Sequence, residues 1–207
     1  MIDDTNAKTK HVLHYPTLKV KEHFRVIYYD GEAALALLRL YQIDKNEQWL
    51  NAVKILFERF IKKDYWKYHD HWLGYCTYEL VQIVDDPRYC EFEVQKVLYI
   101  KNRATIFPTF LEMQIGTYHL VEKAKERGYT DLVAKHMDEK VFIDTIHHRA
   151  DYQRLGYFYP ETAMYFKNPE RTLGAFFIKH HGYRVRIDDI EHYISGFIQF
   201  QKVFKGK

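Results

Sequence analysis

The chain has 207 residues, of which 47% are hydrophobic and 29% charged, and its net charge at pH 7 is +3. A chain of this length and composition can bury a sizeable core, which excludes a disordered protein and a small scaffold held by disulfide bonds. Basic and acidic residues are interspersed, so charge gives no argument for a nucleic-acid partner.

The beginning of the chain shows no targeting signal. Residues 1–10 are polar and charged, and no run of about 18 apolar residues is present, so neither a signal peptide nor a membrane partner is expected. The two cysteines, Cys76 and Cys90, fall inside predicted helices and fit neither a disulfide framework nor a zinc motif. The sequence therefore predicts a cytoplasmic protein or a soluble domain of a larger one.

The chain opens with a predicted mobile tail at residues 1–10, followed by one helical domain over residues 11–207. Short β-like pieces between residues 11 and 29 predict an extended lead-in. Asp30 is predicted to be the N-cap of the helix that follows.

Residues 30–41 are predicted to form the helix around which the fold is built. After the first turn every residue except Arg39 is apolar, so such a helix must be buried on all sides. Two more segments of this inner type begin near residues 70 and 108. Amphipathic outer segments follow each of them, at residues 46–63, 88–102 and 132–148. The inner helices start about 38 residues apart, so the sequence predicts an all-α fold of alternating inner and outer helical hairpins.

The regular pattern ends after the third hairpin. Residues 151–182 are rich in Tyr, Pro and Gly and predict a long irregular insertion, and segments of this kind are often functional. Residues 183–188 alternate apolar and charged side chains, which predicts a small extended segment with Arg184, Arg186 and Asp188 on one face. A closing helix follows through Ile190 and Phe204.

The phrase Tyr-Asp-Gly-Glu-Ala-Ala-Leu-Ala-Leu-Leu-Arg-Leu-Tyr at residues 29–41, followed by Asp-Lys-Asn-Glu-Gln-Trp-Leu at residues 44–50, resembles the (α/α) toroid superfamily. That group includes six-hairpin glycosidases, N-acylglucosamine 2-epimerase-like proteins and lyases of uronic-acid polymers. The resemblance covers residues 28–150 and implies a partial toroid or a helical-repeat arc, with carbohydrate chemistry at the inner-helix mouths. No catalytic residue is carried over from the family.

A first candidate site lies at the end of the predicted insertion. Arg184 and Arg186 could hold an anionic sugar or phosphate, while Asp188 and His192, four residues apart, could do acid-base work. In the alternative interpretation, Asp188 and Glu191 form a helix cap and the arginines are its salt-bridge partners.

A second candidate site lies at the start of the second inner helix. His69, Asp70 and His71 are expected at its mouth, where Trp72 and Tyr75 could stack on a sugar ring. Alternatively, Asp70 is a helix cap and both histidines lie at the surface.

These features lead to a functional prediction. We expect a cleft that binds a small-molecule or glycan ligand, with glycan hydrolysis or sugar epimerisation by acid-base residues drawn from Glu32, Asp70, His71, Asp188 and His192. No cofactor is predicted, and no metal, because the chain has no His-x-x-x-His or Cys-x-x-Cys. The alternative is a non-catalytic helical-repeat module that binds a protein partner, or an inactive part of a larger enzyme.

Overall fold

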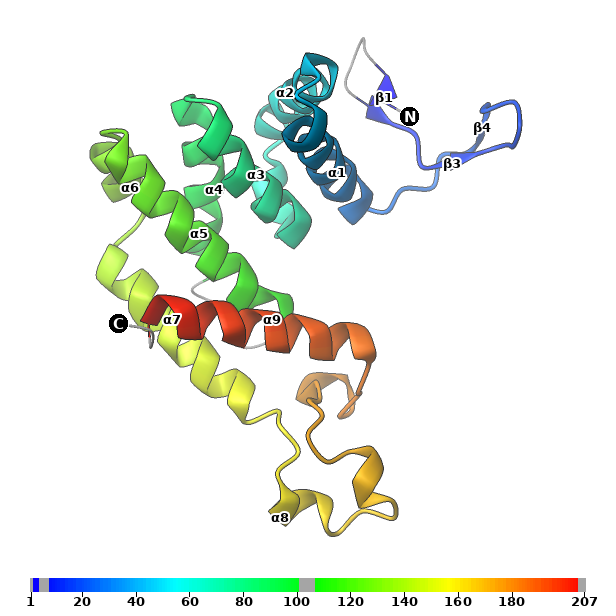
Figure 1. Ribbon diagram of the computed structural model, residues 1–207, viewed down its shortest axis with the longest axis vertical. Coiled ribbons are helices and arrows are strands. Elements are labelled where there is room, and N and C mark those ends of the chain that lie inside the picture. Colours follow the sequence, from blue (N-terminus) through cyan, green and yellow to red (C-terminus); the bar gives the residue numbers. More distant parts are fainter. Residues whose placement is uncertain (1, 4–7, 101–106, 205–207) are drawn as a thin grey trace. The chain divides into compact units, whose positions relative to one another are not determined.

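The computed structural model describes residues 2–3, 8–100 and 107–204 (Figure 1). The chain is mostly helical, which confirms the all-α class, while the toroid arrangement stays a prediction. The helices are α1 (Tyr28–Asp44), α2 (Glu47–Lys62), α3 (His71–Ile83), α4 (Pro87–Ile100), α5 (Thr109–Glu126), α6 (Thr130–His136), α7 (Glu139–Arg154), α8 (Pro160–Ala163) and α9 (Ile187–Phe204). Short 3-10 turns are η1 (Tyr65–Tyr68), η3 (Pro169–Arg171) and η4 (Lys179–His181). Two antiparallel strand pairs precede α1, β1 (Ile2–Asp3) with β2 (Lys8–Thr9) and β3 (Val12–Leu13) with β4 (Val20–Glu22).

The chain divides into two compact units. Unit 1 contains residues 1–96 and 119–136, and unit 2 contains residues 97–118 and 137–207. The expected single domain over residues 11–207 stays a prediction. Within the described ranges, every helix is too short or too polar to cross a membrane.

α1 packs against α2 and α3 in unit 1 (Figure 1). Its buried face includes Ala34, Leu35 and Leu38. The prediction that α1 is buried on all sides is wrong, because α2 and α3 cover only one face. On the opposite face Leu40 is 43% exposed and Ile43 is 81% exposed.

α2 and α3 follow the predicted pattern closely. α2 is the expected amphipathic outer helix, with a buried stripe that includes Leu50, Phe57 and Phe60. Asn46 caps it by accepting a hydrogen bond from the backbone N–H of Gln48 at 3.0 Å. These features confirm the amphipathic helix predicted at residues 46–63, while the alternation of inner and outer hairpins stays a prediction.

Asp30 is not the N-cap of α1, because the helix already begins at Tyr28. Its buried carboxylate instead accepts hydrogen bonds from the side chains of Arg25, Thr9 and Tyr65, and His11 Nε2 lies 3.2 Å away. These contacts attach the extended lead-in and η1 to the first turn of α1. Thr9 belongs to the segment expected to be a mobile tail, and the mobility of that tail stays a prediction.

The predicted outer helix at residues 132–148 is two helices. α6 ends at His136, and α7 starts after Asp138, which caps it by accepting from the backbone N–H of Val141 at 3.0 Å. A capping aspartate breaks the helical path, because its side chain satisfies amides that would otherwise need carbonyls of the preceding turn. α7 then continues beyond the predicted end, to Arg154.

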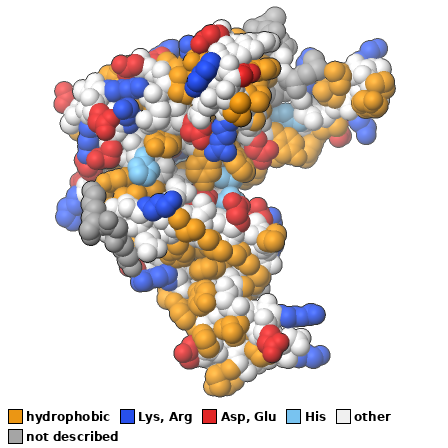
Figure 2. All heavy atoms as spheres, viewed as in Figure 1, with side chains coloured by type: hydrophobic (Ala, Val, Ile, Leu, Met, Phe, Trp, Pro, Cys, Tyr) orange, Lys and Arg blue, Asp and Glu red, His pale blue; other side chains and the backbone are white. Residues whose placement is uncertain are grey.

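Between α7 and α9 the chain is irregular, as predicted, with α8, η3 and η4 joined by isolated bridges. Many apolar side chains are exposed here, including Leu155, Tyr165 and Leu173 (Figure 2). The predicted extended segment at residues 183–188 is only partly present. Arg184 makes a bridge to Ile178, but α9 begins at Ile187, so a strand face shared by Arg184, Arg186 and Asp188 is wrong.

Candidate functional site

The N-terminal ends of α1 and α3 meet in unit 1. A Cβ atom added to Gly31 would lie 2.1 Å from Asp70 Oδ2 and 2.8 Å from the backbone nitrogen of Leu73. The first turns of the two helices are therefore in direct contact, and only glycine permits this approach. We call this place the α1/α3 mouth and define it by Tyr28, Glu32, Asp70, His71, Trp72 and Tyr75.

The α1/α3 mouth carries a cluster of rings. The ring centroid of His71 lies 6.3 Å from that of Tyr28, 4.9 Å from Trp72 and 6.0 Å from Tyr75. The rings of Trp72 and Tyr75 are 6.1 Å apart and nearly perpendicular. Tyr28 is 47% exposed and the other three are half-buried, so the cluster is open to solvent.

Asp70 caps α3, as the alternative interpretation predicted. Its Oδ1 accepts a hydrogen bond from the backbone N–H of Trp72 at 3.0 Å, and the residue is only 3% exposed. Burial raises the pKa of the carboxyl group to about 7, against the opposing effects of Lys96 and the backbone hydrogen bonds; the charge of Glu32 adds to the rise. Asp70 therefore titrates near neutral pH, far above the range of an ordinary aspartate.

A buried ion pair lies beneath Asp70. Lys96 Nζ is 2.8 Å from Glu93 Oε2, and both side chains are almost completely buried. The same Nζ donates to the backbone carbonyl of Asp70 at 3.4 Å. The pair compensates its own charges and fixes α4 against the start of α3.

Two more predicted residues belong to unit 1. Glu32 is exposed on α1, next to Gly31. His69 ends η1 in the left-handed conformation, with φ 54°, and is half-buried directly before Asp70. Further along α3, Glu79 pairs with Arg39 of α1 at 2.9 Å.

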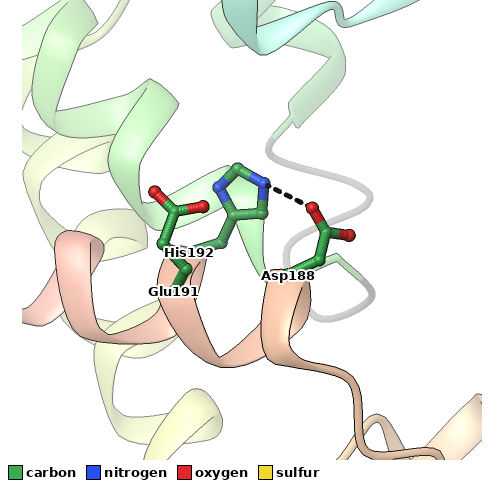
Figure 3. A group of neighbouring side chains, drawn as sticks. All are labelled: Asp188, Glu191 and His192. Carbon is green, nitrogen blue, oxygen red and sulfur yellow. Dashed lines mark ion pairs between the residues drawn. The ribbon is translucent and has the colours of Figure 1, made fainter.

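The second candidate cluster lies at the start of α9 in unit 2. His192 Nδ1 is 2.8 Å from Oε2 of Glu112 on α5, and both residues are buried. On the other side of the ring, Nε2 lies 3.8 Å from Oδ1 of Asp188 (Figure 3). Glu112, His192 and Asp188 thus form a row in which a buried carboxylate orients the imidazole toward an exposed one.

The protonation of His192 is set by opposing effects. Burial by itself would lower the pKa of the imidazole, but the hydrogen bond and charge of Glu112, with smaller contributions from Glu191 and Asp188, outweigh burial and raise the pKa above 6.5. The protonated ring donates from Nδ1 to Glu112, and its Nε2 lies at ion-pair distance, 3.8 Å, from Asp188; the ring is thereby held in one orientation.

The two arginines of the prediction contact acids in the first turn of α9. Arg186 pairs with Asp188, and Arg184 Nε lies 3.4 Å from Oδ2 of the buried Asp189. This agrees with one part of the alternative interpretation, in which the arginines are salt-bridge partners of the helix start. The other part is wrong, because α9 already begins at Ile187 and Asp188 is therefore not its cap. The pairing with Asp188 leaves Arg186 next to the His192 row.

Asp188, Glu191 and His192 also offer ligand atoms that all lie within 4.8 Å of one another (Figure 3). Carboxylate oxygens and an imidazole nitrogen are suitable ligands for a divalent cation. Against this, the guanidinium group of Arg186 already neutralises Asp188, and the positive end of the α9 dipole is at the same place.

The predicted catalytic residues thus fall into two groups. Glu32, Asp70 and His71 meet in unit 1, whereas Asp188 and His192 meet in unit 2. A single opening common to all five stays a prediction. Sequence reasoning missed Glu112 as the partner of His192, because the two residues are 80 positions apart and no local pattern joins them.

Comparisons with known proteins return no relative. No protein-family model matches the sequence, no curated protein matches it, and no solved structure matches it. The resemblance to the toroid superfamily therefore stays a prediction, and the function has to be argued from the residues themselves.

Proposed function

We propose that the α1/α3 mouth binds a carbohydrate or a related polyhydroxylated ligand. The observation that carries the proposal is the open ring cluster of Tyr28, His71, Trp72 and Tyr75 beside the exposed carboxylate of Glu32. Flat aromatic faces cover the C–H faces of a sugar ring, while hydroxyl, imidazole and carboxylate groups can bond to its hydroxyls.

Binding is better supported than catalysis. Hydrolysis or epimerisation needs an acid and a base that both reach the bound sugar. Asp70 has the pKa of a general acid, but its carboxyl group is 3% exposed and occupied by the cap and by the contact with Gly31. The proposed function is therefore that of a carbohydrate-binding domain. Hydrolysis or epimerisation at the same site stays a prediction.

Tryptophan fluorescence tests the proposal. The protein has three tryptophans, Trp49, Trp66 and Trp72. Titration with neutral sugars and with uronic acids should change the emission in a saturable way. Trp72→Phe should abolish the change, and Trp66→Phe, the matched control, should retain it. A response that survives Trp72→Phe, or no response to any sugar, would contradict the proposal.

A second candidate function rests on the uncovered face of α1. Five apolar residues spaced alternately four and three positions apart lie on this face, and we call them the α1 stripe: Tyr29, Ala33, Ala36, Leu40 and Ile43. A spacing of this kind is the pattern of helices that pair along a seam. A helix that is apolar on all sides needs cover, and unit 1 covers only the other side of α1.

The α1 stripe fits a second copy of this chain, packed antiparallel. With a two-fold axis near Ala36, Leu40 of each copy would lie against Ala33 of the other. Glu32 and Arg39, which flank the stripe on the same side, would then face each other across the axis with opposite charges. A parallel pair would bring Glu32 opposite Leu37 instead, so the charges favour the antiparallel pair. The proposed role is that of a helical module that forms a homodimer through α1.

Single cysteines test the orientation of this pair. Both native cysteines are buried, so an introduced cysteine is the exposed one. Ala36→Cys should form a disulfide-linked dimer under mild oxidation, because it lies at the axis. Ile43→Cys should not, since two such residues would be about 21 Å apart. Efficient linkage through Ile43→Cys, or a protein that sediments as a monomer up to roughly 500 µM, would contradict the second candidate.

A further inference from the structure

The largest fully buried side chain in the described ranges is that of Arg149, on α7. The residue is 1% exposed, and its guanidinium carbon lies 4.8 Å from the centre of the Phe110 ring on α5. Within the part of the chain that the structure describes, Nε, Nη1 and Nη2 of Arg149 have no hydrogen-bond partner. A cation with all of its nitrogens buried and unbonded is unusual in a folded protein.

The same two helices carry two buried amide side chains with unbonded atoms. Gln153, one turn after Arg149, donates from Nε2 to the carbonyl of Pro108 at 3.1 Å, but its Oε1 is unbonded. Gln114, one turn after Phe110, has neither Nε2 nor Oε1 bonded among the described residues. Residues four apart share a helix face, so the contacts of Gln153 with Pro108 and of Arg149 with Phe110 place Gln114 on the seam between α5 and α7 as well.

The acids two positions along the chain from Phe110 and from Arg149 are engaged with other partners. Glu112 on α5 is engaged with His192, and Asp151 on α7 pairs with Arg154 at 2.6 Å. Burial lowers the pKa of the Arg149 guanidinium to about 9, which expresses how strongly its surroundings oppose the charge. A methionine or leucine would fill the same space without that cost, so packing alone does not account for an arginine here.

We propose that the α5/α7 seam of unit 2 binds a small oxyanion, a carboxylate or phosphate group, through Arg149 and the amide of Gln114. The planar guanidinium presents parallel N–H donors that fit two oxygens of either group. Nε2 of Gln114 adds a neutral donor. Oε1 of Gln114 and Oε1 of Gln153 would accept from hydroxyl groups of the same ligand or from water. This site shares no residue with the α1/α3 mouth. Either proposal can therefore be disproved without affecting the other.

Thermal unfolding in chloride buffer, with and without added anion, tests this site. Phosphate, acetate and glucuronate are the probes, and glucose is the uncharged control for glucuronate. An anion that binds the folded state should raise the melting temperature by about 5 °C or more at a hundredfold excess over its Kd. A rise with phosphate alone, or with the two carboxylates alone, identifies which group the seam accepts.

Arg149→Met provides the decisive comparison. It should remove the anion-dependent rise and leave the melting temperature in chloride unchanged or higher, because an uncompensated buried charge is gone. Arg154→Met removes an exposed arginine from the same helix and should keep the rise. Arg149→Lys keeps the charge but not the planar fork and should reduce the rise. An equal rise in wild type and Arg149→Met, or no rise with any anion, would overturn the proposal.

Discussion

At the scale of single residues, Asp70 combines a capping role with surroundings that disfavour its charge. The cap needs an oxygen that accepts from the amide of Trp72, and the protonated carboxyl group still provides one, although it accepts more weakly than the carboxylate does. Burial raises its pKa to about 7, above the 3.8 of an unfolded chain. The folded state therefore keeps a proton that the unfolded state releases between these two values.

The stability of the protein should depend on pH through Asp70 in a defined direction. Since the native pKa is raised, the contribution of Asp70 to stability falls as the pH rises from about 4 to about 7, and is constant above that range. Asp70→Asn retains the capping oxygen and cannot ionise. Urea unfolding should show Asp70→Asn gaining about 1–3 kcal/mol relative to wild type between pH 5 and pH 8. A difference that does not change with pH would contradict the raised pKa.

His192 shows the opposite case, a base whose pKa is raised by an acid. Glu112→Gln removes the negative charge beside Nδ1 of His192 but leaves the ring buried. The pKa of His192 should therefore fall below its ordinary 6.5. An NMR titration of the ring protons measures this directly. Asp188→Asn is the control and should cause a smaller fall, because Asp188 is exposed and 3.8 Å from the ring.

The same pair contributes to stability on the acid side. A base with a raised native pKa stabilises the folded state fully below pH 6.5, and the contribution is lost as the pH rises through its native pKa. The loss of stability in Glu112→Gln should therefore be larger at pH 5 than at pH 9. An unchanged His192 pKa in Glu112→Gln would show that this hydrogen bond is not what sets the protonation of the ring.

At the scale of elements, the contact of α1 with α3 depends on Gly31. Alanine is the better helix former by about 1 kcal/mol, but its Cβ would meet Asp70 Oδ2 and the backbone nitrogen of Leu73. The backbone atom cannot move without shifting α3. We expect Gly31→Ala to lower the free energy of unfolding by about 1–3 kcal/mol.

Gly116, in the middle of α5, is the matched control, because an added Cβ there meets nothing within 4 Å. Gly116→Ala should raise the free energy of unfolding by about 0.5–1 kcal/mol, since only helix propensity changes. Urea unfolding of both variants measures the two effects. If both substitutions stabilised the protein equally, the helices α1 and α3 would not meet at Gly31.

The elements also show what sequence periodicity can and cannot predict. The amphipathic stripe of α2 and the Asp70 cap of α3 are local patterns, and both were predicted correctly. The break at Asp138 and the start of α9 at Ile187 were missed. At both places a signal for the start of a helix lies within a few residues of a pattern that predicts another structure: a continuous helix at Asp138, and an extended segment before Ile187. The open face of α1 was missed for another reason. The apolar composition of the helix indicates that its surface should be buried, but it does not indicate which element or partner packs against it.

At the scale of the whole molecule, partners distant in sequence decide the candidate sites. Asp70, His71, Trp72 and Tyr75 lie close together in the chain, so their grouping was predictable, whereas that of Tyr28 with His71 was not. The approach of Gly31 and Glu32, about 40 positions earlier, follows from helix packing that a pattern does not encode. Two further arrangements depend on contacts between distant segments of unit 2 that no local sequence pattern predicts: Glu112 with His192, and Arg149 with its unbonded neighbours.

The indole N–H signals of the three tryptophans test most directly whether the α1/α3 mouth is a ligand site. In a ¹H–¹⁵N NMR titration with the sugar that gives the largest fluorescence change, the signal assigned to Trp72 by Trp72→Phe should shift until saturation. The signals of Trp49, whose indole donates to Asp44, and of Trp66 should stay in place. Shifts confined to Trp49 or Trp66, or no shift at saturating sugar, would contradict the account.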